Sequence, residues 1–222
     1  MRPRVALSWS SGKDAAWALH VMRDAGEVDV VALLTTMNSH FNRVAMHGVR
    51  ADVVRAQAAA VGVPLVEAPL PWPCPNEAYE AAMRDALAKL RTEFAITHVA
   101  FGDLFLEDVR AYREERMAGT GIGALFPIWG VDTRALAATM LGAGVRAYVT
   151  VADPRVVPRE VAGREWDAQL LAELAPNIDP CAERGEFHTV AVDGPAFKTP
   201  LSLARGKVVE RDGFVFADFV LR

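Results

Sequence analysis

The sequence predicts an α/β protein with a doubly wound, mainly parallel sheet, followed by a smaller mixed α+β part. Short apolar runs alternate with helix-like segments over most of the chain, as in successive βαβ units. The run VDVVALLT (28–35) is dense in apolar and β-branched residues, as in a strand covered on both faces. Because this alternation stops near residue 152, we expect one domain at 1–152 and a second region at 153–222.

The individual elements follow from apolar runs and from the residues that interrupt them. The predicted strands cover residues 5–9, 28–35, 63–67, 97–101, 125–129 and 146–151. The predicted helices cover residues 14–25, 50–61, 76–94, 106–118, 133–141 and the segment EWDAQLLAELA (165–175). Asn76 is the expected N-cap of the third helix. Asp212 and Gly213 are the expected turn of a hairpin near the C-terminus.

The composition excludes several classes of protein. The chain has 222 residues, 52% of them hydrophobic, and a net charge of −4, so we expect no nucleic-acid partner. Its two cysteines, Cys74 and Cys181, lie far apart and form no CxxC pair, which is typical of a reducing compartment. The sequence contains no run long enough to cross a membrane. We therefore expect a cytoplasmic protein without a membrane partner.

The most informative stretch is SSGKD (10–14), which follows the first predicted strand. Ligands of open parallel sheets bind beyond the carboxyl ends of the strands. The small residues leave backbone N–H groups free to surround an anion at the start of the helix. Lys13 can then offer a charge to a phosphate, and Asp14 can serve a metal ion or cap the helix. The alternative is a plain turn between strand and helix.

Other polar stretches follow the later strands. The loop at 37–50 carries histidines and arginines without apolar periodicity, which is typical of a substrate-binding or a mobile surface loop. Asp103 follows the fourth strand, and Glu107 and Arg110 lie near the start of the next helix. They are candidates for the site, although charges at such spacing also occur on solvated helix faces.

The run GEFHT (185–189) places a carboxylate and an imidazole two residues apart. If the chain is extended here, Glu186 and His188 lie on the same face. Such a pair can transfer a proton or hold a polar substrate, but it can also be a structural hydrogen bond.

The stretch WSSGKD resembles the PP-loop, SGGxD[ST], of ATP pyrophosphatases. Ser10, Gly12 and Asp14 match the pattern, and Lys13 fills its variable position. Ser11 replaces a glycine. Ala15 replaces the final serine or threonine, which removes one hydroxyl contact to phosphate.

The chain as a whole resembles the diphthine–ammonia ligase family, in the branch typical of bacteria. The resemblance includes WSSGKD, HGVR, FGDLFLEDVRAYREERM, FPIWGVDT and DPCAERGEFHTVAVDGPAF. In the C-terminal motif GE-x-GE-[FY]-HT, Ala182 replaces the first glycine. The matching residues are Glu183, Gly185, Glu186, His188 and Thr189.

The resemblance implies a Rossmann-like domain of the adenine nucleotide α-hydrolase type, with ATP and Mg²⁺ as cofactors. It implies a ligase that makes an acyl-adenylate, releases pyrophosphate and forms an amide with ammonia. The implied ATP-binding residues are Ser10, Ser11, Gly12, Lys13, Asp14, Thr35, Thr36, His47, Gly48, Arg50, Gly102 and Asp103, with Asp14 holding Mg²⁺ through ATP. The implied substrate residues are Glu107, Arg110, Glu183, Glu186, His188 and Thr189, and the implied catalytic residues are Lys13, Asp14, Glu186 and His188.

The substrate and two alternatives stay open. Bacteria do not make diphthamide, so a bacterial member is expected to act on another carboxylate. One alternative is a PP-loop enzyme that adenylates a nucleobase in RNA for thiolation or lysine transfer; thiolation would call for Cys74 and Cys181 as a working pair. The other is a nucleotide-binding protein without catalysis, which Ala15 favours. The sequence also leaves a homodimer open.

Overall fold

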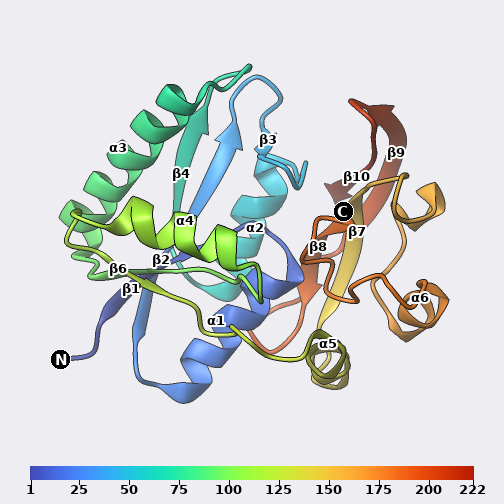
Figure 1. The fold of residues 1–222 in the computed structure, drawn as a ribbon, viewed down its shortest axis with the longest axis horizontal. Helices are drawn as coiled ribbons and strands as arrows, with labels where there is room; N and C mark the ends of the chain where they lie inside the picture. Colours follow the sequence, from blue (N-terminus) through green and yellow to red (C-terminus); the bar gives the residue numbers. More distant parts are fainter.

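The computed structural model describes residues 1–222 and contains two sheets (Figure 1). The first sheet consists of β1 (Arg4–Ser8), β2 (Asp29–Asn38), β3 (Arg43–Val44), β4 (Leu65–Leu70), β5 (His98–Ala100) and β6 (Gly123–Leu125). Its parallel strands run in the order β4–β2–β1–β5–β6, and the short β3 pairs antiparallel with the end of β2. The predicted doubly wound sheet is confirmed.

Helices cover both faces of this sheet. Val5 and Leu7 of β1 pack with α1 (Lys13–Ala25) and α2 (Ala51–Val61) in one apolar cluster. Ala6, between them, faces the opposite cluster, which contains residues of α3 (Asn76–Phe94) and α4 (Glu107–Met117). The alternation along β1 therefore separates the two helical layers. Pro75, not Asn76, occupies the N-cap of α3, and no side chain caps that helix.

The second sheet is antiparallel and consists of β7 (Arg146–Ala152), β8 (Phe187–Asp193), β9 (Leu203–Arg211) and β10 (Phe214–Leu221). Its order is β8–β7–β10–β9. β9 and β10 form the predicted hairpin, and both turn residues, Asp212 and Gly213, have positive φ as a type I′ turn requires. Around this sheet lie α5 (Thr133–Gly142), α6 (Ala168–Glu173) and a short 3₁₀ helix (Arg159–Val161).

Two predicted strands differ from the structure. The strand expected at 125–129 is β6, which ends at Leu125 because Pro127 has no N–H to continue the ladder. The strand expected at 146–151 exists as β7, but it pairs in the second sheet instead of extending the first. Its partners come much later in the chain, so local periodicity could not show this pairing. The division after residue 152 stays a prediction.

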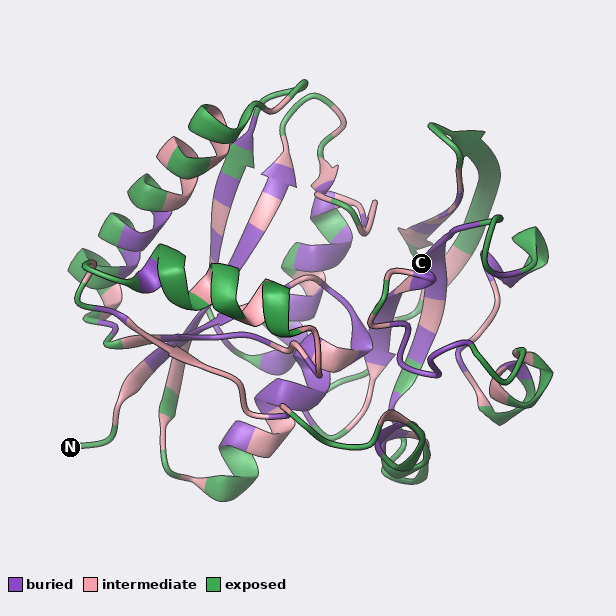
Figure 2. Ribbon diagram, viewed as in Figure 1, coloured by how far each residue is buried: buried purple, intermediate pink, exposed green.

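The two sheets share one core. A cluster of 44 buried residues contains side chains of β1, α1 and α2 together with Val149 of β7 and Phe219 of β10. α1 and α2 therefore lie between the sheets, and Figure 2 shows their buried positions along this junction. No helix is both long and apolar enough to span a bilayer. This arrangement places the loop after β1 against β8, where the Ala191 N–H donates to the Ser11 carbonyl oxygen (2.8 Å).

Candidate functional site

The strand order of the first sheet changes direction between the neighbouring strands β1 and β5. Strands β2 and β4 follow on one side of β1, whereas β5 and β6 lie on the other. In such sheets the crevice beyond the carboxyl ends of the two central strands is the usual ligand site. A cavity of about 200 Å³ lies here. Its walls are formed by Ser8, Ser10, Lys13, Asp14, Ala15, His47, Phe101, Gly102, Asp103, Arg113, Cys181, Ala182, Glu183, Phe187, His188 and Thr189.

The loop that begins α1 is tightly packed at its backbone. Ser11 has φ of 75°, in the left-handed region that favours glycine. A Cβ on Gly12 would lie 3.1 Å from His47 Cε1, and one on Gly102 would lie 3.2 Å from the backbone of Asp14 and Ala15. Glycine at positions 12 and 102 therefore allows the loops that carry His47 and Gly102 to approach the N-terminus of α1 closely.

Gln57 of α2 holds this loop in place, and the sequence analysis missed it. Its Nε2 donates to the carbonyl oxygens of Ser11 (3.0 Å) and Ala191 (2.6 Å), and its Oε1 accepts from Trp9 Nε1 (3.0 Å). The side chain is fully buried. The available signal was a polar amide at an apolar position of an alanine-rich helix.

Lys13 is the buried cation of the cavity. Only 1% of the residue is exposed, and its Nζ donates to both Asp14 carboxylate oxygens and to the carbonyl oxygen of Cys181 (2.6 Å). Burial is the largest single effect and opposes its positive charge, but Asp14, Cys181 and Asp179 together outweigh burial, so the pKa of Lys13 is raised. The ammonium is therefore charged, and its three protons are engaged.

Asp14 and Ala15 occupy the next two positions of α1. The Asp14 side chain is 26% exposed and faces the cavity, whereas Ala15 is buried in its wall. No group of three or more His, Cys, Asp or Glu side chains is arranged to hold a metal ion. Mg²⁺ is usually held by one or two carboxylates together with substrate phosphates, and Asp14 is the carboxylate at the PP-loop that could contribute to such a site.

The C-terminal region contributes Glu183 to the cavity. Glu183 Oε1 accepts from the backbone N–H of Leu104 (2.7 Å), which joins the 179–186 loop to the segment after β5. Burial raises the pKa of Glu183 to about 7. Asp179 positions this loop by accepting from the backbone N–H groups of Cys181 and Glu183.

Glu186 has a different environment from the one predicted. It is buried, and its carboxylate accepts from the backbone N–H groups of Asp179 (3.2 Å) and Arg184 (3.1 Å). It does not line the cavity, and it makes no hydrogen bond to His188. The carboxylate and the imidazole are therefore not brought together, because the chain turns back at Glu186 before β8 begins.

His47 and His188 meet across the cavity, with ring centroids 4.5 Å apart. The His47 Nδ1 lies 3.2 Å from the carbonyl oxygen of Thr189, whose hydroxyl oxygen accepts from Lys13 N–H (3.2 Å). Desolvation lowers the pKa of His47 to about 3 and that of His188 to about 4. Both rings are neutral at physiological pH, so His47 donates through Nδ1–H and keeps Nε2 as an acceptor.

Several predicted ATP-binding residues lie outside the cavity wall. Arg50 makes a bidentate ion pair with Asp218 of β10 (2.9 and 2.6 Å), and Arg43 donates to the same carboxylate (2.8 Å). Gly48 packs against Phe216. The loop at 43–50 is thus tied to the second sheet. Thr35 and Thr36 lie at the end of β2, and the buried Thr35 hydroxyl has no hydrogen-bond partner.

The charged residues after β5 divide between the cavity and the surface. Asp103 faces the cavity and pairs with Arg113, a residue that the sequence analysis missed. Glu107 is exposed, and Arg110 pairs with Glu114 while its guanidinium stacks on Phe126. Neither lines the cavity. The available signal for Arg113 was its position three residues after Arg110, one turn further along the same helix.

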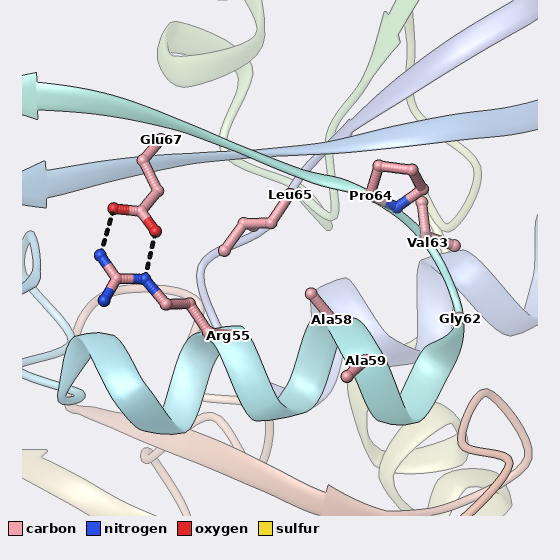
Figure 3. A pocket seen from close by; sticks show the side chains of 8 residues that line it. All are labelled: Arg55, Ala58, Ala59, Gly62, Val63, Pro64, Leu65 and Glu67. Carbon is pink, nitrogen blue, oxygen red and sulfur yellow. Dashed lines mark hydrogen bonds and ion pairs between the residues drawn. The ribbon is translucent and has the colours of Figure 1, made fainter.

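A second hollow of about 420 Å³ lies between α2 and β4 (Figure 3). It contains none of the predicted site residues. Its two charged side chains, Arg55 and Glu67, form a bidentate ion pair (2.6 and 2.9 Å) and so satisfy each other. The remaining wall is mostly alanine, valine and leucine, which provides no group for catalysis.

Comparison with known families identifies the N-terminal part of the chain. Residues 3–122 match the family model described as diphthamide synthase N-terminal domain, and these residues contain strands β1 to β5 of the first sheet and the loop at 10–14. Comparison with curated proteins finds no match. The matched segment is more than half of the chain and confirms the resemblance seen in the sequence. The protein therefore belongs to the diphthamide synthase N-terminal domain family, a family of ATP-using PP-loop domains.

Proposed function

We propose that the protein is an ATP-dependent carbon–nitrogen ligase of the diphthine–ammonia ligase type. It activates a carboxylate as an acyl-adenylate and then forms an amide with ammonia. The observation that supports this most is the PP-loop at the switch point of the sheet, in one cavity with Lys13, Asp14 and Glu183. The family match to an ATP-using PP-loop domain supports the use of the nucleotide.

The reaction makes a poor electrophile reactive in two steps. A carboxylate oxygen attacks the α-phosphorus of ATP, the bond to the bridging oxygen breaks, and pyrophosphate leaves. Ammonia then attacks the acyl carbon, AMP leaves with the carbon–oxygen bond pair, and the nitrogen loses a proton to solvent. Both leaving groups carry negative charge, so fixed positive charge in the cavity favours both steps.

This chain's residues provide that charge and hold the phosphates. The positive end of the α1 dipole favours an anion at the helix N-terminus, and Lys13 lies within the same turn. Asp14 is the carboxylate that would hold Mg²⁺, and the ion would neutralise phosphate charge when bound. The unpartnered hydroxyl of Ser11, which is fully buried, is a further polar group beside this turn.

The size of the cavity indicates which part of the nucleotide it takes. Ligand pockets usually have volumes of about 300–1,000 Å³. A cavity of about 200 Å³ is small for a whole nucleotide but sufficient for phosphate groups and a carboxyl group. We place the adenosine outside it, toward Thr35 and Thr36 at the end of β2.

The direct test measures AMP and pyrophosphate formed from Mg-ATP and ammonium, with and without a low-molecular-weight cell extract. We expect both products in equal amounts, with a rate that rises with extract and identifies the acceptor on fractionation. The variant Lys13→Met should abolish both products while the exposed Lys89→Met on α3 should not. ADP and phosphate as the products would contradict α-phosphate chemistry.

A non-catalytic nucleotide-binding protein is the second candidate, and two observations favour it. Ala15 places a methyl group in the cavity wall where the motif has a hydroxyl, and Lys13 already donates all its protons within the protein. ATP binding without AMP or pyrophosphate would support this candidate. Recovery of both products in Ala15→Ser would show that the missing hydroxyl is the cause.

The structure offers little support for sulfur transfer to RNA. Burial raises the pKa of the Cys181 thiol to about 12, and this thiol donates to the carbonyl oxygen of Thr133 (3.5 Å). Cys74 does not line the cavity. A thiol that stays protonated is a poor nucleophile.

A further inference from the structure

We propose that Arg113 is an oxyanion-binding residue of the cavity, with one edge of its guanidinium reserved for a carboxylate or phosphate group of a substrate. The proposal rests on the proposed function only in taking this cavity as the place where substrates bind. Arg113 lies in the stretch FGDLFLEDVRAYREERM, but the resemblance assigns it no role, so the assignment depends on what the folded chain places around it.

Arg113 is the only charged donor in the cavity with protons to spare. The cationic side chains of the wall are Lys13 and Arg113, because both histidines there are neutral. Lys13 Nζ already has three acceptors. Arg113 uses Nε (2.9 Å) and Nη2 (3.4 Å) toward Asp103, and its Nη1 makes no hydrogen bond.

The guanidinium is held in one orientation. Asp103 engages its Nε edge, and its Cζ lies 4.6 Å from the centroid of the Phe101 ring. The Arg113 side chain is 28% exposed, whereas Ala111, Tyr112, Glu114, Glu115 and Arg116 around it are all exposed. A planar group fixed by stacking and one ion pair loses little freedom when its other edge binds an anion.

The charges of the cavity are already close to balanced, so an entering anion depends on directed hydrogen bonds and not on net positive charge. Asp14 and Asp103 are matched by Lys13 and Arg113, and Glu183 adds a third carboxyl group. A further carboxylate or phosphate that enters here must therefore find a hydrogen-bond donor that offers two protons in its own plane. Arginine has this geometry for both kinds of oxyanion, and lysine does not.

The test compares three probes on four proteins. Mg-ATP and inorganic pyrophosphate are titrated by calorimetry and acetate by chemical-shift changes, on wild type, Arg113→Met, Arg113→Lys and Arg116→Met. Arg116 lies three residues further on the same helix and pairs with Glu80 on the surface, so its variant is the matched control. We expect Arg113→Met to weaken at least one probe about tenfold or more, and Arg113→Lys to restore this only in part. Arg116→Met should bind like wild type.

The pattern of losses identifies the anion. Weakening of acetate alone assigns Arg113 to the carboxylate substrate, and weakening of pyrophosphate or Mg-ATP assigns it to a phosphate. Unchanged binding of all three probes to Arg113→Met overturns the proposal, as does a wild-type protein that binds none of them. If Arg113→Met fails to fold, the NMR signal of the Arg113 Nε–H in the wild-type protein tests the proposal instead. The proposal requires this signal to shift when a probe binds. AMP formation is measured separately on wild type and on Arg113→Met. If wild type forms AMP and the variant matches it in AMP formation and in probe binding, this inference fails while the proposed function stands.

Discussion

The ammonium group of Lys13 donates a 2.6 Å hydrogen bond to the backbone carbonyl oxygen of Cys181. This contact joins the first helix of the parallel sheet to the loop that precedes β8 in the second sheet. The backbone N–H of Lys13 also donates to the Thr189 hydroxyl. One residue of the PP-loop thus holds the C-terminal region over the cavity, and the cavity exists only when both parts are in place.

Removal of the Lys13 charge should destabilise the fold. In Lys13→Met the Asp14 carboxylate loses its partner, and breaking a buried pair in this way costs about 3 kcal/mol or more in the free energy of unfolding. Urea denaturation of the variant and of Lys89→Met measures the effect. A stability within about 0.5 kcal/mol of wild type would show that the pair is not buried as described.

Ser11→Gly should stabilise the protein by about 1 kcal/mol, because a left-handed residue costs about 1–2 kcal/mol unless it is glycine, and glycine loses part of this gain through backbone entropy. Ser11→Ala is the matched control, since it removes the unpartnered hydroxyl but keeps the strained φ. Thermal unfolding should rank glycine above alanine. Because both variants lack the hydroxyl, the reverse order would mean that the left-handed backbone at position 11 is not a source of strain.

Asp218→Ala should release the loop at 43–50 from β10. Arg43 and Arg50 lose their shared acceptor, and since these groups are partly exposed we expect a loss of only about 1 kcal/mol in stability. The sharper readout is His47, whose pKa of about 3 depends on desolvation. NMR titration should show this pKa rising toward 6.5 in Asp218→Ala. The control is Glu210→Gln on β9, which removes an exposed ion pair with Arg159 and should leave the pKa of His47 unchanged.

Glu183→Gln should remove a pH dependence of folding stability. The pKa of Glu183 rises on folding from 4.5 to about 7, so the folded state favours the protonated carboxyl. Its contribution is therefore fully present below pH 4.5 and is lost as the pH rises toward 7. Urea denaturation from pH 4.5 to 8 should show wild type losing stability relative to Glu183→Gln across this window. A constant difference between the two proteins would contradict the shifted pKa.

The elements of the first sheet were predictable because their signals are local. The apolar run at β1, the small residues at 10–12 and the helix behind them specify a strand, a turn and an anion-binding helix start within a few residues of each other. The same holds for the β9–β10 hairpin, where Asp212 and Gly213 alone determine the turn.

The errors concern contacts that hydrophobic periodicity does not show, either with distant segments or within an irregular loop. The run that forms β7 looks like any buried strand, and its sheet is decided by β8 and β10. Arg110 and Arg113 are equally charged and lie on one helix, yet only packing on Phe101 or Phe126 determines which of them faces the cavity. Glu186 carries a motif carboxylate, but the turn of its loop directs that group to backbone N–H groups.

By itself, the sequence determined the order of strands and helices, the family, and the loop that begins α1, because each depends on neighbouring residues and their periodicity. Only the tertiary structure decided the second sheet, the buried Lys13 contact with Cys181, the support from Gln57 and the free edge of Arg113. These depend on backbone carbonyls and on pairings between distant segments, which no residue pattern encodes locally.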